Sequence, residues 1–448
     1  MALRQDFMPG PGLRIAVIGA GISGLSAAWL LSRHHDVALF EAEHRLGGHS
    51  NTVEVDGVAV DTGFIVYNEA TYPNLTALFA TLKVETRATD MSFAVSLDAG
   101  RLEYAGTLGG LFVQPRNLIS PRFAMMLADL LRFYRHAPRD LPHMGAQNLD
   151  TYLDSHRYGQ AFRHDHLYPM AAAIWSTPAA DIGRYPAAAF VRFCVNHGLL
   201  KVTGRPIWRT VAGGSRTYVA RLRQDFRGRL AVGCAVRAVR RLKDGVCVVD
   251  ASGAQHHVDQ VLIATHADQA LAMLDSPTPD EIKLLGAFRY SRNRAVLHAD
   301  AQLMPRHRRA WAAWNYLSDP QSAKGPSVTY WMNRLQHLPT PHPLFVTLNP
   351  IRDPQSATLA CDIAYRHPLF DTAAMAAQQR LWSLQGQGGV WFCGAYFGAG
   401  FHEDGLQAGL AAAEHLGRVR RPWTVAEESS RIILPDPEQA RAPRGDSP

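Results

Sequence analysis

Three glycines with the spacing Gly-x-Gly-x-x-Gly follow an apolar run and precede a helical pattern. The run Ile15–Ile18 is too short for a helix and is bounded by glycine, which is typical of a buried parallel strand. Gly19 permits a tight turn, Gly21 lets a pyrophosphate lie against the backbone, and Gly24 lets the next helix pack close to the sheet. The N–H groups and dipole at that helix start attract phosphates. The residues predicted to bind the phosphates of a dinucleotide are Gly19, Gly21, Ile22, Ser23 and Gly24.

An acidic residue completes this pattern. A second apolar run, Val37–Phe40, ends in Glu41, seventeen residues past Gly24. A carboxylate at this place can accept hydrogen bonds from a ribose diol. The glycine spacing alone is a weak signal, but a strand before it, a helix after it and an acid at the end of the next strand together predict a dinucleotide-binding unit. We expect Glu41 and the adjacent Ala42 to contact the cofactor.

A second pair of glycines indicates which dinucleotide is bound. Arg45-Leu46-Gly47-Gly48 follows Glu41 closely, and Gly63 comes after a hairpin-like stretch. A plain NAD domain does not need this pair, whereas the longer FAD runs past more backbone. These motifs resemble the superfamily of flavin-containing amine oxidases, phytoene desaturases and protoporphyrinogen oxidases. In that family the Arg-x-Gly-Gly element lies along the FAD. The resemblance therefore implies that Arg45, Gly47, Gly48 and Gly63 bind the cofactor.

Later motifs extend the resemblance along the chain. One is similar to the family's Gly-Gly element beside the flavin, one to a valine that packs on the adenine, and one to a strand end followed by a flavin-facing helix. The dipole of such a helix stabilises negative charge on the flavin. This chain has Ala395 where the family often has an acid, and Asp404 where it often has Glu. The implied contacts are Gly213, Gly214, Val236, Gly394, Asp404, Gly405 and Leu406.

The fold expected from these motifs is α/β. A Rossmann-like (doubly wound) FAD-binding domain of discontinuous segments should carry an inserted α+β substrate domain. The expected FAD-binding segments are 1–80, 205–285 and 386–420, and the expected substrate-domain segments are 81–204 and 286–385. Residues 421–448 are rich in Pro, Glu, Arg and Ser, and we expect a flexible tail there.

Bound FAD would carry the chemistry, and the protein would supply orientation, a dry pocket and electrostatics. The simplest reaction is hydride removal from a C–H bond to flavin N5. There is no second Rossmann motif for NAD(P)H, so the electrons should pass to oxygen or another acceptor. There is no family-like cysteine motif for covalent attachment, so FAD should be non-covalent. His402, before the flavin-facing helix, is the candidate catalytic base. Tyr396, Phe397 and Phe401 are candidates for a pocket wall.

One phrase points to a substrate class. Residues 166–178 resemble a phrase in a bacterial subgroup of predicted NAD/FAD-binding proteins and in the oxidase-like N-terminal domain of plant cyclopropane fatty acid synthases. The association implies a lipid acyl substrate and a lipid methyltransferase partner. Two other interpretations stay open. An FAD amine oxidase is one, although few acids mark the presumed substrate loops. A non-catalytic flavoprotein partner of a lipid methyltransferase is the other.

Composition sets the remaining bounds. The 448 residues are 47% hydrophobic, which indicates a globular protein with a large core. The net charge of +7 is scattered, and nothing beyond charge suggests a nucleic-acid partner. Five cysteines without a Cys-x-x-Cys pair fit a reducing, cytoplasmic setting without structural zinc. His164-Asp165-His166 lacks a third ligand at a defined spacing, so we expect no metal.

Membrane signals are weak in the sequence. There is no apolar leader before the first strand, and no run approaches the ~20 apolar residues that a bilayer span needs. The basic stretch Arg306–Arg309 lies beside Trp311 and Trp314, which would suit peripheral contact with anionic lipid. A solvated basic loop is the simpler interpretation of the same residues.

Overall fold

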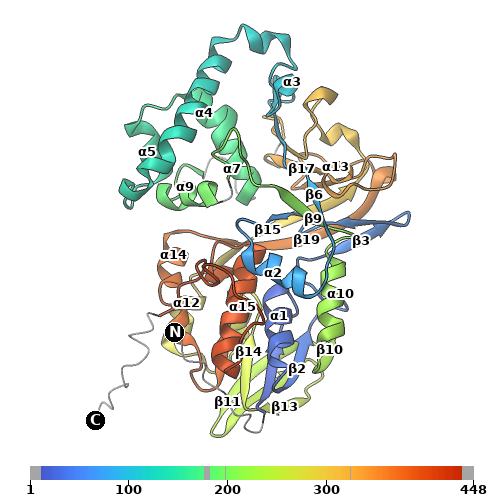
Figure 1. Cartoon of the computed structure of the whole chain (residues 1–448), viewed down its shortest axis with the longest axis vertical. Helices are drawn as coiled ribbons and strands as arrows, with labels where there is room; N and C mark the ends of the chain where they lie inside the picture. Colours follow the sequence, from blue (N-terminus) through green and yellow to red (C-terminus); the bar gives the residue numbers. More distant parts are fainter. Residues whose placement is uncertain (1–11, 176–181, 197, 323, 436–448) are drawn as a thin grey trace.

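The computed structural model describes residues 12–175, 182–196, 198–322 and 324–435. The lower part of Figure 1 is built on a five-stranded sheet whose order is β10-β2-β1-β14-β20. All four neighbouring pairs are parallel, and Ile18 of the central strand lies opposite Phe40 and Ile263. The strands are β1 (Arg14–Ile18), β2 (Asp36–Glu41), β10 (Arg229–Val232), β14 (Gln260–Ile263) and β20 (Val390–Phe392).

Two helices from opposite ends of the chain pack together in this domain. α1 (Ile22–Leu31) leaves the glycine turn, and α15 (His402–Gly417) follows the last strand. A Cβ on Gly24 would overlap the carbonyl oxygen of Gly19, and a Cβ on Gly409 would overlap that of Ser23. The close contact between helix, turn and second helix therefore requires glycine at both places. All ten residues of α1 are buried, as expected for a helix that is apolar all round.

Further elements complete this domain around one hydrophobic core. An antiparallel meander lies at the lower end of this domain in Figure 1, and further helices pack around the parallel sheet. The strands of the meander are β11 (Val236–Leu242), β12 (Gly245–Asp250) and β13 (Gln255–Val258). The helices are α2 (Pro73–Thr81), α10 (Arg216–Asp225), α11 (Ala267–Met273) and α12 (Pro279–Leu285).

The upper part of Figure 1 combines a mixed sheet with a group of helices. Its seven strands have the order β19-β15-β18-β17-β16-β7-β8, and only the β16–β7 pair is parallel. The strands are β7 (Phe93–Leu97), β8 (Leu102–Ala105), β15 (Arg289–His298), β16 (Trp314–Leu317), β17 (Ser327–Trp331), β18 (Phe345–Leu348) and β19 (Leu359–Leu369). The helices are α3 (Leu108–Leu111), α4 (Pro121–Asp140), α5 (Leu149–Ser155), α6 (Gln160–Phe162), α7 (Tyr168–Trp175), α9 (Ala187–Asn196) and α13 (Met332–Gln336). Short 3-10 turns and one π-helical turn, η3 (Arg163–Leu167), connect them.

The predicted α/β architecture is confirmed, and the domain expected to bind FAD is assembled from separated segments of the chain. Its borders differ from the predicted ones. A small sheet of β5 (Tyr67–Asn68), β9 (Trp208–Val211) and β6 (Thr86–Thr89) crosses the borders expected at 80 and 204. The helix α14 (Thr372–Gln378) buries Ala374 and Ala377 in the core of the FAD-binding domain, so that domain resumes earlier than residue 386. Part of the phrase at 166–178 lies outside the described residues.

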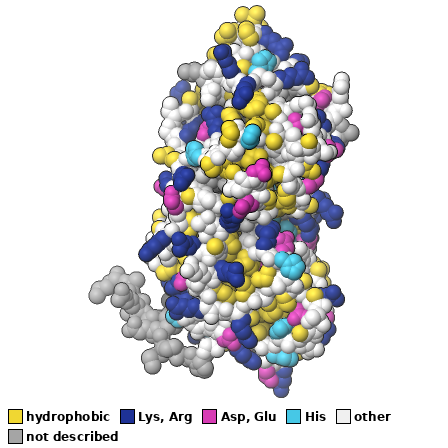
Figure 2. All heavy atoms as spheres, turned by 90° about the vertical axis from the view of Figure 1, so that its right-hand side faces the viewer, with side chains coloured by type: hydrophobic (Ala, Val, Ile, Leu, Met, Phe, Trp, Pro, Cys, Tyr) yellow, Lys and Arg dark blue, Asp and Glu magenta, His cyan; other side chains and the backbone are white. Residues whose placement is uncertain are grey.

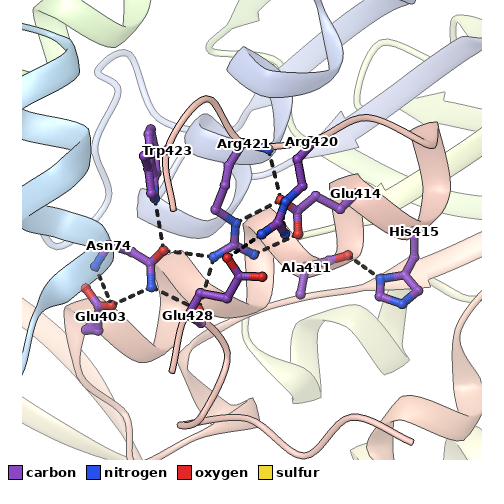
Figure 3. Close-up of polar contacts among 9 residues, drawn as sticks. All are labelled: Asn74, Glu403, Ala411, Glu414, His415, Arg420, Arg421, Trp423 and Glu428. Carbon is purple, nitrogen blue, oxygen red and sulfur yellow. Dashed lines mark hydrogen bonds and ion pairs between the residues drawn. The ribbon is translucent and has the colours of Figure 1, made fainter. Parts of the chain in front are cut away.

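The expected flexible tail is wrong for residues 421–435. Figure 3 shows Arg421 between Glu414 of α15 and Asn74 of α2, and its side chain is 0% exposed. Its guanidinium donates to the Glu414 carboxylate at 2.8 Å through two nitrogens and to the Asn74 carbonyl oxygen at 2.8 Å. Trp423 stacks on Trp29 of α1. Composition did not reveal this segment, because its few buried side chains act through tertiary partners.

The Arg421 contacts should contribute strongly to stability. Arg421→Met is expected to lower the free energy of unfolding by about 3–5 kcal/mol, because it removes the fully buried guanidinium that pairs with the mostly buried Glu414 carboxylate and donates to Asn74. Arg420→Met is the matched control, since Arg420 also contacts Glu414 but is 55% exposed, and it should cost less than about 1 kcal/mol. Urea denaturation measures both values. Equal losses in the two variants would contradict a special role for the buried arginine.

Candidate flavin site

The glycine turn has the geometry of a phosphate cradle. Gly19 (φ 99°) packs against the backbone of Ala264, and a Cβ on Gly19 would lie only 2.9 Å from the Ala264 carbonyl oxygen. A Cβ on Gly21 would meet nothing within 4 Å, so the turn faces open space at that point. Gly21 is also the N-cap of α1, and no side chain caps the helix. The first amides of α1 are thus left for an anionic ligand, with Ile22 and Ser23 buried behind them.

Glu41 lies at the carboxyl end of β2 beside the glycine turn. Its carboxylate accepts hydrogen bonds from the Ala20 N–H at 2.7 Å and the Glu43 N–H at 2.9 Å. Its carbonyl oxygen accepts from the Cys234 N–H at 2.8 Å, two residues before Val236 begins β11. The structure therefore brings Glu41, the exposed Ala42 and the start of β11 to one edge. Glu41 also fixes the turn itself, which the motif does not indicate.

The Arg-x-Gly-Gly loop folds over the same turn. Arg45 donates to the Gly48 carbonyl oxygen at 2.7 Å, and the Gly47 N–H donates to the Ala20 carbonyl oxygen at 2.9 Å. A Cβ on Gly48 would lie 3.1 Å from the Gly21 Cα. Gly63 packs against the next residue of the loop, where a Cβ would overlap the carbonyl oxygen of His49. The four predicted residues are thus gathered around the turn.

The second Gly-Gly element is held by a buried acid. Gly214 (φ 86°) packs against Thr52 and Asp61. The Asp61 carboxylate accepts from the Thr52 hydroxyl at 2.5 Å and from the Ser215 N–H at 2.9 Å. It also accepts from the Gln336 amide of the substrate domain at 2.8 Å. Burial raises the pKa of Asp61 to about 6, against the opposing effect of these donors. Sequence reasoning assigned Asp61 no role, although its place two residues before Gly63 was visible.

The C-terminal motif brings a second helix start to the glycine turn. A Cβ on Gly394 would lie 3.4 Å from the Thr265 carbonyl oxygen, beside the ends of β14 and β20. A Cβ on Gly405 would lie 2.8 Å from the Ser23 hydroxyl oxygen of α1. Asp404 accepts from the Phe401 N–H at 2.7 Å and closes the first turn of α15, and Leu406 is fully buried. The N-termini of α1 and α15 therefore adjoin, which favours an anionic group near both.

His402 is tightly held at the start of α15. Its Nε2 lies 2.7 Å from the Tyr218 hydroxyl and 3.3 Å from the Ser50 hydroxyl. Its ring stacks on Phe64 at 3.9 Å. Burial lowers the pKa of His402 to about 3, so the imidazole is neutral near pH 7. Its role as the base stays a prediction.

The expected pocket wall forms only in part. Tyr396 and Phe397 are buried in the core of the FAD-binding domain, where Tyr396 packs on Phe288. Both side chains point into that core, so they do not face the substrate domain. Phe401 does face it, and its ring stacks on Phe193 of α9 at 4.9 Å.

Three histidines that sequence reasoning missed meet between the two domains. They are His49 after Gly48, His266 after β14 and His367 on β19, and we call them the histidine cluster. The His49 ring centroid lies 6.1 Å from that of His266 and 5.4 Å from that of His367. The buried atoms His49 Nε2 and His266 Nδ1 have no hydrogen-bond partner within the described chain. Orphaned buried polar atoms beside the glycine turn fit a site for a polar ligand such as a flavin or its substrate.

The histidine cluster is uncharged near neutral pH. Burial lowers the pKa of His49. Burial, with a smaller effect of the neighbouring histidines, lowers the pKa of His266 to about 4 and that of His367 to about 3. Aromatic and polar groups surround the rings. Tyr365 stacks on His49 at 5.0 Å and Tyr290 on His266 at 4.4 Å. These residues are far apart in sequence and follow no motif.

Two side chains of His164-Asp165-His166 contact other residues of the substrate domain. Asp165 pairs with Arg122 at 2.7 Å, and His166 Nδ1 lies 2.9 Å from the Tyr104 hydroxyl. Within the part of the chain that the structure describes, no group of three or more His, Cys, Asp or Glu side chains is arranged to hold a metal ion. Cys393 is buried and its thiol pKa is raised by burial, which is the behaviour of a packing residue.

Comparison with known proteins agrees with this geometry. The family model described as flavin containing amine oxidoreductase matches residues 22–298. The chain belongs to this family. FAD is accordingly its cofactor, and the open glycine turn, the two adjoining helix starts and the orphaned ring nitrogens fit it.

The individual relatives and solved structures carry the names of different enzymes. Coproporphyrinogen III oxidase of Mycobacterium leprae is 28% identical over 292 residues, which cover 59% of this chain and 62% of that protein. A fatty acid isomerase structure from P. acnes aligns with a TM-score of 0.65 at 14% identity, covering 91% of this chain and 98% of the other. Cyclohexylamine oxidase from Brevibacterium oxydans gives a TM-score of 0.65 at 16% identity, covering 91% and 99%. These structures share the fold, and the sequence matches span about three fifths of the curated relatives.

The open space at Gly21 can be tested by alanine substitution. Gly21→Ala should leave the fold intact but weaken FAD binding at least about tenfold, since the methyl group fills space needed by the pyrophosphate. Gly24→Ala should instead disturb the fold, because its Cβ overlaps the Gly19 carbonyl oxygen. Gly109→Ala is the control, as a Cβ there also meets nothing within 4 Å. FAD retention on a desalting column and thermal unfolding of the apoprotein separate the cases. Full FAD retention by Gly21→Ala would contradict this account of the turn.

The depressed pKa of His367 predicts a pH-dependent contribution to stability. The unfolded chain binds a proton on this imidazole near pH 6.5, whereas the folded protein binds it only near pH 3. The free energy of unfolding therefore decreases as the pH falls below 6.5, by at most about 1.4 kcal/mol per pH unit for this group. His367→Gln has no imidazole to protonate at this position. The free energy of unfolding of the variant minus that of the wild type should therefore be about 1 kcal/mol higher at pH 5 than at pH 6. Urea midpoints at both pH values test this, and an unchanged difference would contradict it.

Proposed function

We propose that this protein is an FAD-dependent oxidoreductase that removes a hydride from a C–H bond of an apolar substrate, and that the substrate is a lipid acyl chain. The observation that carries the proposal is the neutral histidine cluster, which lies beside the glycine turn between the two domains. The resemblance of residues 166–178 to proteins associated with lipid modification supports the acyl substrate and a lipid methyltransferase partner.

The protein's own residues divide the work of such a reaction. Bound FAD would supply the acceptor for the hydride and the route of the electron pair to oxygen or another acceptor. Forming a carbon–carbon double bond from two adjacent C–H bonds also releases one proton. His49 Nε2 and His266 Nδ1 are buried and uncharged, and neither has a hydrogen-bond partner among the described residues, so either can receive that proton. The aromatic rings of Tyr365 and Tyr290 hold the two imidazoles in place.

An amine substrate is the second candidate, because the family and the cyclohexylamine oxidase share this fold. An ammonium group would seek a carboxylate near the flavin. The buried acids there are already engaged. Asp61 accepts from Ser215, Glu403 accepts from Asn74 at 2.9 Å, and Asp404 pairs with Arg431 at 3.4 Å. This supports an uncharged substrate over a cationic one.

An anaerobic spectral titration of the FAD-loaded protein tests the proposal. Fatty acids and phospholipids in detergent micelles are added first, and polyamines and cyclohexylamine are added to a fresh sample. Bleaching of the flavin absorbance by lipid is the expected result. Bleaching by amines alone would show an amine oxidase, and bound FAD that no donor bleaches would favour a non-catalytic flavoprotein.

The role of the histidine cluster has a separate test. His49→Asn should slow lipid-dependent bleaching by about a hundredfold or more, as expected when a general base is lost. The wild-type rate should stay flat between pH 5 and pH 8, since the pKa of His266 is about 4 and that of His367 about 3. His402→Asn is the comparison variant. A large loss in His402→Asn with a normal rate in His49→Asn would assign the base to His402 instead.

A further inference from the structure

The end of the substrate domain that lies farthest from the FAD-binding sheet exposes apolar side chains. In Figure 1 the chain between α3 and α4 forms this end, and Figure 2 shows hydrophobic side chains gathered there beside Lys and Arg side chains. Ile119 is 84% exposed, Leu118 65% and Met125 60%. Phe112 is exposed beside them. We call Phe112, Leu118, Ile119 and Met125 the apex.

The apex is a built structure rather than a loose loop. Asn117 is buried and donates to the Glu103 carbonyl oxygen at 3.1 Å. Gln114 is buried as well, and it accepts from the Glu103 N–H at 3.0 Å. Ser120 caps α4 by accepting from the Phe123 N–H at 3.3 Å. These anchors point inward, so Leu118 and Ile119, which lie between two of them, are held outward.

The apolar surface continues along α4. Its inner face buries Phe123, Met126 and Phe133. Its outer face exposes Ala124, Met125, Ala128 and Leu131, at the spacing of one helical stripe. The exposed side of the helix also carries Arg122, Arg135 and His136, so these apolar side chains lie among basic ones. Exposed apolar side chains gathered in this way mark an interaction site.

Arginines surround the apex. Residues 104–139 contain five arginines and a single acid, Asp129, which pairs with Arg132 at 2.8 Å. Arg101, Arg116 and Arg122 line a hollow of about 380 Å³ at the base of the apex, although Arg101 and Arg122 are paired with Asp98 and Asp165.

A second basic element is fixed beside the apex. The buried Glu103 accepts from the Arg306 N–H at 2.7 Å and the His307 N–H at 3.0 Å. The stretch Arg306–Arg309, which the sequence suggested for anionic lipid, is exposed and lies against α3 and β8. Glu103 thus holds four basic side chains at the edge of the apolar surface while its own charge is buried.

We propose that the apex docks on a bilayer containing anionic phospholipid, with Leu118 and Ile119 among the acyl chains and the arginines at the headgroup phosphates. In a membrane interface the acyl chains lie beneath the anionic headgroups. Exposed apolar side chains with arginines around them are suited to contact both layers at once. No helix among the described residues is long and apolar enough to cross a membrane. The contact proposed here is a peripheral one. The apex would meet the bilayer whatever substrate the flavin oxidises.

Vesicle sedimentation with the FAD-loaded full chain tests the proposal. Wild-type protein should bind vesicles of phosphatidylglycerol and phosphatidylcholine, bind pure phosphatidylcholine at least tenfold less, and lose affinity as salt is raised. The double variant L118S/I119S should bind the anionic vesicles at least about tenfold more weakly, because two exposed apolar side chains no longer insert. R116E/R309E should remove the preference for anionic lipid. Ile282→Ser is the matched control, since Ile282 is 53% exposed on α12 of the other domain. This variant should bind the vesicles as the wild type does.

The alternatives give different results. Each variant must retain FAD and its unfolding temperature, so a loss of binding cannot reflect misfolding. Unchanged vesicle binding by L118S/I119S, or no binding by the wild type, would overturn the proposal. A dimer of the wild type without vesicles that L118S/I119S dissociates would show that a second copy covers the apex instead, and would also overturn it.

Discussion

The absence of side chains at Gly24 and Gly409 is the constraint on which the rest of the structure depends. At Gly24, α1 touches the carbonyl oxygen of Gly19, and at Gly409, α15 touches that of Ser23. These contacts set the N-termini of α1 and α15 side by side at the carboxyl end of the parallel sheet. Helix starts at that edge form the usual anion site of such folds. Because one helix is near the start of the chain and the other near its end, the domain must be assembled from separated segments.

Buried polar groups then fix how the separated segments sit. Asp61 joins the hairpin of β3 (Thr52–Val55) and β4 (Val58–Asp61) to the start of α10 and to Gln336 of the substrate domain. At the opposite side, Glu403 accepts from the Leu75 N–H at 2.9 Å, and Arg421 ties α15 to α2. Buried charges are costly unless all their partners are present. Their value here lies in permitting one arrangement of α15, and therefore one position for the groups at its start.

The sequence predicts the features that depend on local backbone geometry. Gly21 lies in the glycine turn and Glu41 at the end of the next strand, and their spacing is that of a dinucleotide-binding motif, so both positions could be found in the sequence. The histidine cluster was not, because His49, His266 and His367 come from three distant segments, and only the folded chain brings them together. The packed segment after Arg421 was missed for the same reason, since a Pro-rich composition carries no sign of a partner on α2.

Tyr396 and Phe397, which were predicted to line a pocket but lie in the core, show the same limit of prediction from sequence. Tyr396 and Phe397 follow a correctly predicted strand end, but which way a side chain points after such a turn depends on what packs beneath it. Tyr396 packs on Phe288 and Phe397 near Trp382, both inside the FAD-binding domain. Phe401, only a few residues later, packs against the core of the substrate domain. The motif therefore located the loop, while tertiary packing decided which of its aromatic residues face the substrate domain.

The depressed pKa values of the histidine cluster bear on the order of events in the proposed reaction. An imidazole with a pKa near 3 or 4, as in His367 and His266, is a weak base while its surroundings are uncharged. A negative charge within about 4–6 Å raises the pKa of an imidazole. Asp268 acts on His266 in this way, but burial outweighs it. A hydride held on bound FAD would add a further negative charge close to the cluster, whose affinity for a proton would then rise as the electrons leave the substrate. This suits removal of hydrogen from an apolar bond, because an imidazole charged from the start would bind water or an anion in the place of the substrate.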